Sequence, residues 1–213
     1  KINVIEGVTG LGFGQTQALA DLRQHYRFSF QPQHRVAGRS AHLISVAARD
    51  DLRFGYQIYV DQQTALPLRI VVLDGEGQQQ SQMMFVELKT GQAVPPIEHD
   101  VAALQMAAQD RITMPIQADS PDNANWRFKH LPEGFALRQY RTDQQRQHFI
   151  LSDGLASVSL YVELPDEEAV FDGLSHIGAT RAFGAIQHGH QLIAVGEVPD
   201  ITLRLIVDAL EPR

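Results

Sequence analysis

Two histidines separated by one glycine, His188 and His190, form the pair whose spacing best suits chemistry, because residues two apart on a strand face the same side. Two imidazoles on one side could share a metal ion. Gly189 between them is typical of a turn, and no acidic or histidine residue near them in the sequence would complete a ligand set. We therefore interpret the pair as a solvated hairpin tip and predict no metal site.

A glycine-rich stretch, Gly10-Leu-Gly-Phe-Gly14, resembles a nucleotide-binding loop. It lacks the full G-x-G-x-x-G spacing, and no lysine followed by serine or threonine comes after it, so the cradle for a phosphate is incomplete. We predict a flexible segment here and no bound cofactor.

Ser175 and His176 are the nearest approach to a nucleophile and its base, within a glycine-flanked segment over 173–178. The segment lacks the G-x-S-x-G spacing and the strand-to-helix context of a nucleophile elbow, so we interpret it as a loop. The acidic runs 50–51 and 166–168 are interpreted as solvated charges, because a general acid needs a desolvated carboxyl group. The sequence therefore predicts no catalytic residues and no enzyme.

Composition narrows the classes of function further. The 213 residues allow one large domain or two small ones, and a net charge of −7 argues against nucleic acid, whose phosphates need a basic face. The absence of cysteine excludes disulfides and thiol chemistry but does not decide the compartment. No apolar run reaches the roughly 20 residues of a spanning helix, and residues 1–6 do not resemble a signal peptide.

The first part of the chain is predicted to be an antiparallel meander, because apolar and polar residues alternate and turn residues separate the runs. Strands are expected over 26–30, 42–48, 54–60, 66–73 and 79–88. Aromatic residues on these strands are interpreted as core, with one wall of a concave apolar cavity as the alternative. They are Tyr26, Phe28, Phe30, Phe54, Tyr56, Tyr59 and Phe85.

Glycines and prolines break the pattern over 89–125, where one helix is expected at 98–110 within an interdomain linker. Strands then resume, and Val198-Pro-Asp200 is predicted to start a final helix. The predicted organisation is a first domain over 1–90, a linker over 91–124 and a small α+β domain over 125–213. The later strands are expected over 135–141, 147–151, 156–163, 180–186 and 191–197.

Several short phrases, ordered along residues 26 to 211, resemble the RseB/MucB family of periplasmic regulators of the sigma-E (AlgU) pathway. Their ordered occurrence, with a proline-rich break between the two groups, carries the resemblance. The phrases are Arg35–Arg39, Ala48–Asp50, Arg53–Tyr56, Val60–Asp61, Thr64–Leu68, Leu73–Gly77, Met84–Phe85, Trp126, Leu131–Phe135, Ser152–Ser159, Gly178–Thr180 and Val195–Pro199.

The resemblance implies a large domain similar to the lipoprotein carriers LolA and LolB, a curved antiparallel sheet covered by helices, followed by a small α+β domain. Family members begin well upstream of the segment that matches Tyr26, so the LolA-like sheet is expected to be incomplete in this chain. It also implies a periplasmic location and binding to the periplasmic region of a membrane-anchored anti-sigma factor (RseA or MucA). That partner is shielded from the site-one protease, and lipid or lipopolysaccharide signals release it. The resemblance implies no cofactor and no membrane-spanning segment. It does not decide whether the protein forms a homo-oligomer.

Exposed aromatics and arginines are the usual anchors of such interfaces. The alternative is core packing for the aromatics and solvated surface for the arginines. A different function, periplasmic lipid or lipoprotein carriage, is implied by the same architecture, although the carriers lack a second domain. The candidate partner-binding residues are Trp126, Phe128, Arg138, Arg181 and Phe183.

Overall fold

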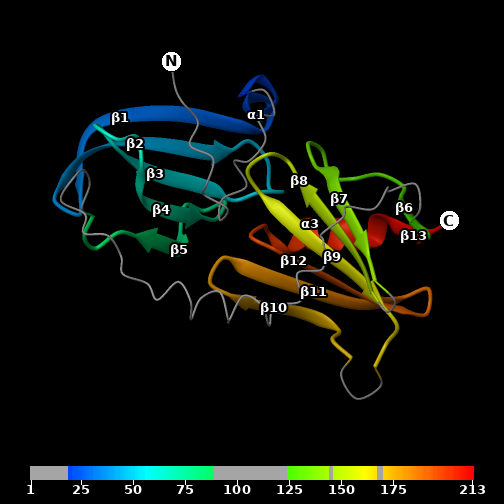
Figure 1. Cartoon of the computed structure of the whole chain (residues 1–213). Helices are drawn as coiled ribbons and strands as arrows, with labels where there is room; N and C mark the ends of the chain where they lie inside the picture. The colour runs from blue at the N-terminus through cyan, green and yellow to red at the C-terminus, as the bar shows by residue number, and fades with distance from the viewer. Residues whose placement is uncertain (1–18, 89–123, 144–145, 167–169) are drawn as a thin grey trace, which may run out of the picture.

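The chain folds into two antiparallel sheets and a two-stranded ribbon (Figure 1). The predicted α+β class with mainly antiparallel strands is confirmed. The expected helix at 98–110, the glycine-rich stretch and nearly all of the linker lie outside the described residues, so the domain boundaries at 90 and 124 stay predictions. The computed structural model describes residues 19–88, 124–143, 146–166 and 170–213.

The first sheet is a meander of five strands in chain order, as the alternating pattern predicts. β4 begins at Pro67, a position where a strand tolerates proline, and β5 ends at Met84, before the expected Leu88. The elements are α1 (Leu19–His25), β1 (Tyr26–Val36), β2 (Arg39–Ala48), β3 (Gly55–Asp61), β4 (Pro67–Leu73) and β5 (Gln79–Met84).

One face of the first sheet carries apolar side chains across all five strands. Residues directly opposite each other on paired strands point to the same face, and the register aligns them in two rows. The centre is covered, with Ile70 5% exposed, whereas the ends are open, with Phe30 60% and Met83 57% exposed. We call this face the apolar wall. Its rows are Phe30, Ile44, Ile58, Ile70, Met83 and Phe28, Val46, Tyr56, Val72.

The aromatic residues expected in the core divide into three groups, and Phe28 and Tyr59 form the one that is partly buried and packs against the core clusters. Tyr26, Phe54 and Tyr56 are buried, so the core interpretation is confirmed for them. It is wrong for Phe30 and Phe85, which are exposed, because each lies at the periphery of the first sheet.

The second sheet has six strands in the order β10-β11-β12-β9-β8-β7, and α3 packs its apolar residues against one face (Figure 1). The helix beginning after Pro199 is confirmed. The segment 173–178 is not the predicted loop: it forms the edge strand β10, whose exposed residues show no apolar alternation. The elements are β6 (Trp126–Phe128), β7 (Ala136–Thr142), β8 (Arg146–Ser152), β9 (Ser157–Glu163), β10 (Gly173–Ile177), β11 (Thr180–Gln187), β12 (His190–Gly196), α3 (Asp200–Ala209) and β13 (Leu210–Pro212), with β6 and β13 forming the ribbon.

A buried ion pair joins the two sheets. Arg53, in the loop between β2 and β3, donates from Nε to Asp153 Oδ2 at 2.8 Å, and both side chains are 0% exposed. The Tyr26 hydroxyl donates to the same oxygen at 2.8 Å. The guanidinium also contacts Asp50 and the Glu133 carbonyl, so the expectation that Asp50 is solvated is wrong. We call this contact the Arg53–Asp153 joint.

The turn between β8 and β9 is built around the same carboxylate. Asp153 Oδ1 accepts the backbone N–H groups of Leu155 and Ala156 at 2.9 and 2.8 Å, so each oxygen has two donors. Close by, Thr202 of α3 donates its hydroxyl to the Leu52 carbonyl at 2.6 Å. Gly134 has φ +84°, and a Cβ there would lie 2.6 Å from the His25 ring, so the loop before β7 can approach α1 only with glycine.

Replacing Asp153 with asparagine should destabilise the protein strongly. The amide N–H₂ would face the Arg53 and Tyr26 donors, and the buried guanidinium would lose its counter-charge. We expect the free energy of unfolding, measured by urea denaturation, to fall by about 3–5 kcal/mol, the usual cost of orphaning a buried charge.

The exposed pair between Arg127 and Glu211 provides the control. Glu211 pairs with Arg127 and also with Lys129, whose side chains are 62% and 57% exposed, so Glu211→Gln should cost only about 1 kcal/mol. Equal losses for the two variants would contradict the role assigned to the joint.

A second carboxylate organises the turn between β3 and β4. Asp61, 1% exposed at its side chain, accepts backbone N–H groups from Gln63 and Thr64 at 2.9 Å each and pairs with Arg39. The Arg39 hydrogen bond, followed by those from the turn, holds the pKa of Asp61 well below its usual range.

Asp61 should therefore stabilise the fold in a pH-dependent way. Because the folded pKa is depressed, the contribution is complete above the unfolded value of about 3.9 and is lost as pH falls through the folded pKa. We expect the difference in unfolding free energy between the native chain and Asp61→Asn to be constant from pH 7 to about 5 and to shrink by pH 3. Asp51→Asn, at an exposed aspartate, is the control, and a difference that does not change down to pH 3 would contradict the assignment.

Candidate functional site

An apolar cavity of about 530 Å³ lies against the apolar wall at β3, β4 and β5. Its deep side is formed by buried residues, among them Ile70 and Val72, and its outer side by the exposed Met83 and Phe85. Such a lining suits an aliphatic or aromatic group removed from water. The full lining is Tyr56, Leu66, Pro67, Ile70, Val72, Ser81, Gln82, Met83, Phe85 and Glu197.

The strands position this lining by simple alternation. Tyr56 and Val72 lie opposite each other on β3 and β4, and Ile70 and Met83 on β4 and β5, so all four point to one face. Leu66 closes one end, because its carbonyl accepts the Asp61 N–H at 2.8 Å across the turn. The cavity wall is therefore part of the sheet and does not depend on a separate loop.

Two polar groups stand out at this cavity, and they come from different sheets. Burial, followed by the nearby charges of Asp153 and Glu197, raises the pKa of Tyr56 above its ordinary range, so the phenol stays neutral. Glu197, just after β12, is exposed and has no hydrogen-bond or ion-pair partner among the described residues. The arrangement can hold an apolar group beside one carboxylate. We therefore interpret it as a binding site.

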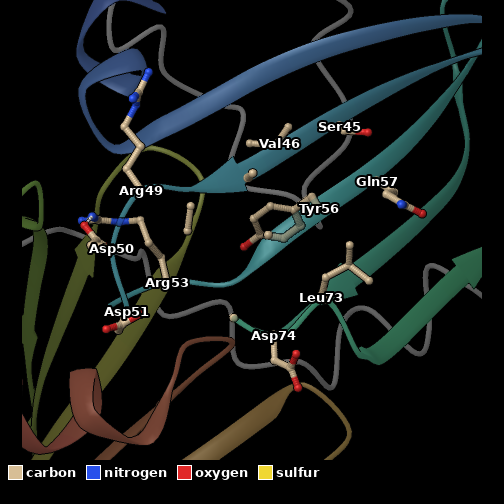
Figure 2. Close-up of a pocket in the computed structure, with 15 residues that line it drawn as sticks. Ser45, Val46, Arg49, Asp50, Asp51, Arg53, Tyr56, Gln57, Leu73 and Asp74 are labelled. Atoms are coloured by element: carbon tan, nitrogen blue, oxygen red, sulfur yellow. Dashed lines mark hydrogen bonds and ion pairs between the residues drawn. The ribbon is translucent and has the colours of Figure 1, made fainter.

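A second depression, of about 350 Å³ and lined by both polar and apolar residues, lies beside the Arg53–Asp153 joint (Figure 2). Figure 2 shows Asp50 and Arg53 close together in the loop, with Tyr56 on the neighbouring strand. Arg49 also lines it and donates to the backbone carbonyl of Tyr26 at 3.3 Å. These contacts serve the joint, whereas Tyr56 lines both cavities.

The described ranges contain no group of three histidine, cysteine, aspartate or glutamate residues that could hold a metal ion. Within the same ranges, no helix is long and apolar enough to cross a membrane. His188 and Gly189 form the tight turn expected between β11 and β12. The two histidine rings do have a partner: they approach Trp126 edge-on, at centroid distances of 6.0 and 5.1 Å.

The three aromatic candidates for partner binding lie in or against the core of the second sheet. Trp126 is 4% and Phe183 8% exposed, and Phe128 packs edge-on against Phe149 at 5.6 Å. Arg204 lies over the Phe183 ring at 4.6 Å. Contact between these aromatics and a partner would need the surface above them to open, and their binding role stays a prediction.

The two arginine candidates differ in their surroundings. Arg181 donates to Asp200 at 3.0 Å and to Gln80 of the first sheet at 3.4 Å, so it holds the sheets together. Arg138 is exposed on β7. Sequence reasoning missed Arg53 and Asp153, which lie 100 positions apart, and the cavity residue Glu197. Their only sequence signal was membership in the family-like phrases, since no local pattern marks a long-range contact.

Comparisons with known proteins agree with the resemblance. The family model for the MucB/RseB N-terminal domain matches residues 6–108, and that for the MucB/RseB C-terminal domain matches residues 120–211. The sigma factor AlgU regulatory protein MucB of Pseudomonas aeruginosa is 30% identical over 204 residues, which cover 91% of this chain and 63% of that protein. The chain thus spans less than two thirds of the length of this curated relative.

Two solved structures are similar over most of the chain. The complex of Pseudomonas aeruginosa MucA and MucB matches with a TM-score of 0.69 at 28% identity, covering 93% of this chain and 69% of that one. MucB in complex with MucA(peri) matches with a TM-score of 0.68 at 26% identity, covering 93% and 72%. Because both domain models match in order and the fold agrees, the chain belongs to the MucB/RseB family.

Proposed function

We propose that this chain binds the periplasmic region of a membrane-anchored anti-sigma factor of the RseA or MucA kind and so protects it from proteolysis. The observation that carries the proposal is the similarity, over 93% of the chain, to a MucB solved in complex with MucA(peri). The relative named as a sigma factor regulatory protein supports regulation over catalysis. A periplasmic location follows from the same partner.

The geometry favours a docking role. The Arg53–Asp153 joint fixes the two sheets against each other, and the cavity between Tyr56 and Glu197 takes residues from both. A preorganised surface loses little conformational entropy when a partner binds. Arg138 on β7 and Arg181 on β11 remain candidate anchors.

Calorimetric titration of the chain with the periplasmic region of its cognate anti-sigma factor tests the proposal. We expect saturable binding with a Kd of about 1 µM or tighter, as for other specific regulatory complexes. The same region in scrambled order is the control and should give no saturable heat.

Two outcomes would count against the proposal to different degrees. Binding only by a version extended to the full length of the relatives would place part of the docking surface upstream of this chain. Absence of binding by both versions would remove the regulator proposal.

A second candidate function, lipid or lipoprotein carriage, is favoured by the apolar wall. Phe30 and Met83, at the two ends of this wall, are 60% and 57% exposed. The cavity of about 530 Å³ would accept part of an acyl chain. A carrier should bind cis-parinaric acid with a rise in its fluorescence and should contain acyl chains in organic extracts of the purified protein. Negative results in both measurements would exclude it.

A further inference from the structure

The outer edge of β5 is open within the described part of the chain. β5 is the last strand of the first sheet and pairs only with β4 there. The Phe85 N–H donates to the Leu68 carbonyl at 2.9 Å and so points toward β4. Because successive backbone groups of a strand point in opposite directions, the N–H groups of Met84 and Gln82 point away from the sheet. Among the described residues no strand pairs with these donors.

The side chains along this edge are apolar and exposed. Met83, Met84, Phe85 and Val86 are 57%, 48%, 44% and 87% exposed, four consecutive residues. An open edge flanked by apolar side chains is a template for strand addition, which native proteins normally cover or use.

The second sheet limits how far an added strand could run. The turn between β10 and β11 lies against the start of β5, since a Cβ on Gly178 would be 3.2 Å from the Gln80 carbonyl oxygen. Arg181 also reaches Gln80, at 3.4 Å. The accessible edge is therefore short, from Gln82 to Val86, and it runs beside the apolar cavity.

We propose that an extended segment of the partner adds as a sixth strand to β5, with apolar side chains at alternate positions and a lysine or arginine among them. Strand addition uses main-chain hydrogen bonds for affinity and side-chain pockets for specificity. One apolar side chain enters the cavity beside Ile70 and Met83, and the basic side chain pairs with Glu197. The inference rests on the proposed function and names the segment of the anti-sigma factor that would dock here.

Charge selects a peptide over an anionic lipid at this position. Glu197 has no counter-charge among the described residues, and it lines the cavity. A carboxylate there repels phosphate or carboxylate headgroups and attracts a cation. The unpaired N–H groups of the edge add a second requirement, a row of carbonyl acceptors at strand spacing, which a polypeptide meets and an acyl chain does not.

A pair of variants at Met84 separates the backbone from the side chain. Met84→Pro removes an outward N–H without removing a hydrogen bond to β4, whereas Met84→Thr keeps the N–H. In calorimetric titration with the periplasmic region of the anti-sigma factor, we expect Met84→Pro to bind roughly tenfold more weakly and Met84→Thr to stay within about threefold of the native chain. Equal melting temperatures for the two variants would show that the fold is retained. If Met84→Pro has the lower melting temperature, strand addition is tested instead by amide hydrogen exchange over residues 79–88 of the native chain. This exchange should slow when the partner binds.

A second pair tests the carboxylate. Glu197→Gln should weaken binding by about threefold at low salt, and the effect should vanish at high salt, because exposed charges are screened. Glu163→Gln, on β9 and paired with Arg146, is the control and should leave binding unchanged.

The outcomes separate this inference from the proposed function. No binding by the native chain would remove both. Native binding that neither Met84→Pro nor Glu197→Gln weakens, with unchanged exchange over 79–88, would overturn strand addition and leave the regulator proposal standing. Binding of cis-parinaric acid that the partner does not displace, together with partner binding that these variants leave unchanged, would assign the cavity to lipid.

Discussion

The burial of one positive charge constrains this whole structure. The Arg53 side chain is 0% exposed and can stay charged in the interior only because the Asp153 and Asp50 carboxylates and the Glu133 carbonyl surround it. Such a pair adds little net stability over an apolar substitute, since desolvation offsets most of the attraction. Its geometry is demanding, however, because the donors must meet particular oxygen atoms. The main effect of the pair is therefore to fix the position of one sheet relative to the other. It sets the first sheet against the second, and the cavity with Tyr56 on one side and Glu197 on the other exists only in that placement.

Local pattern was sufficient for most strands but not for the contacts between them. Alternation predicted most strands of the two sheets, because most have one buried face, whereas β5 has no buried residue and was predicted from the turn residues before it. β10 was missed for the opposite reason: all but one of its residues are exposed, so it carries no alternation. The short β6 and β13 have too few residues to show a period. The Arg53–Asp153 pair joins positions 100 apart, and no spacing rule reaches that far.

The apolar wall accounts for why two functions compete as explanations. A half-open sheet with a buried centre and exposed ends can hold an acyl chain or the side chains of a peptide, and both would use the same cavity. Two ligands that exclude each other from one site are linked, and each lowers the apparent affinity of the other by the same factor. Release of a partner by lipid would then need no conformational change, only occupancy. Family-level resemblance predicted the two ligands, whereas the cavity itself could be seen only in three dimensions.

The contact between Trp126 and the histidines of the β11–β12 hairpin has an optical consequence. This is the single tryptophan of the chain, it is buried in the core that the ribbon shares with the second sheet, and two imidazole rings lie at its edge. Tryptophan fluorescence therefore reports on the second sheet and its ribbon. The first sheet has only tyrosine and phenylalanine, which emit almost nothing when the light is at the red edge of tryptophan absorption. Comparing emission with far-ultraviolet circular dichroism during denaturation would reveal whether the two sheets melt as one cooperative unit or in sequence.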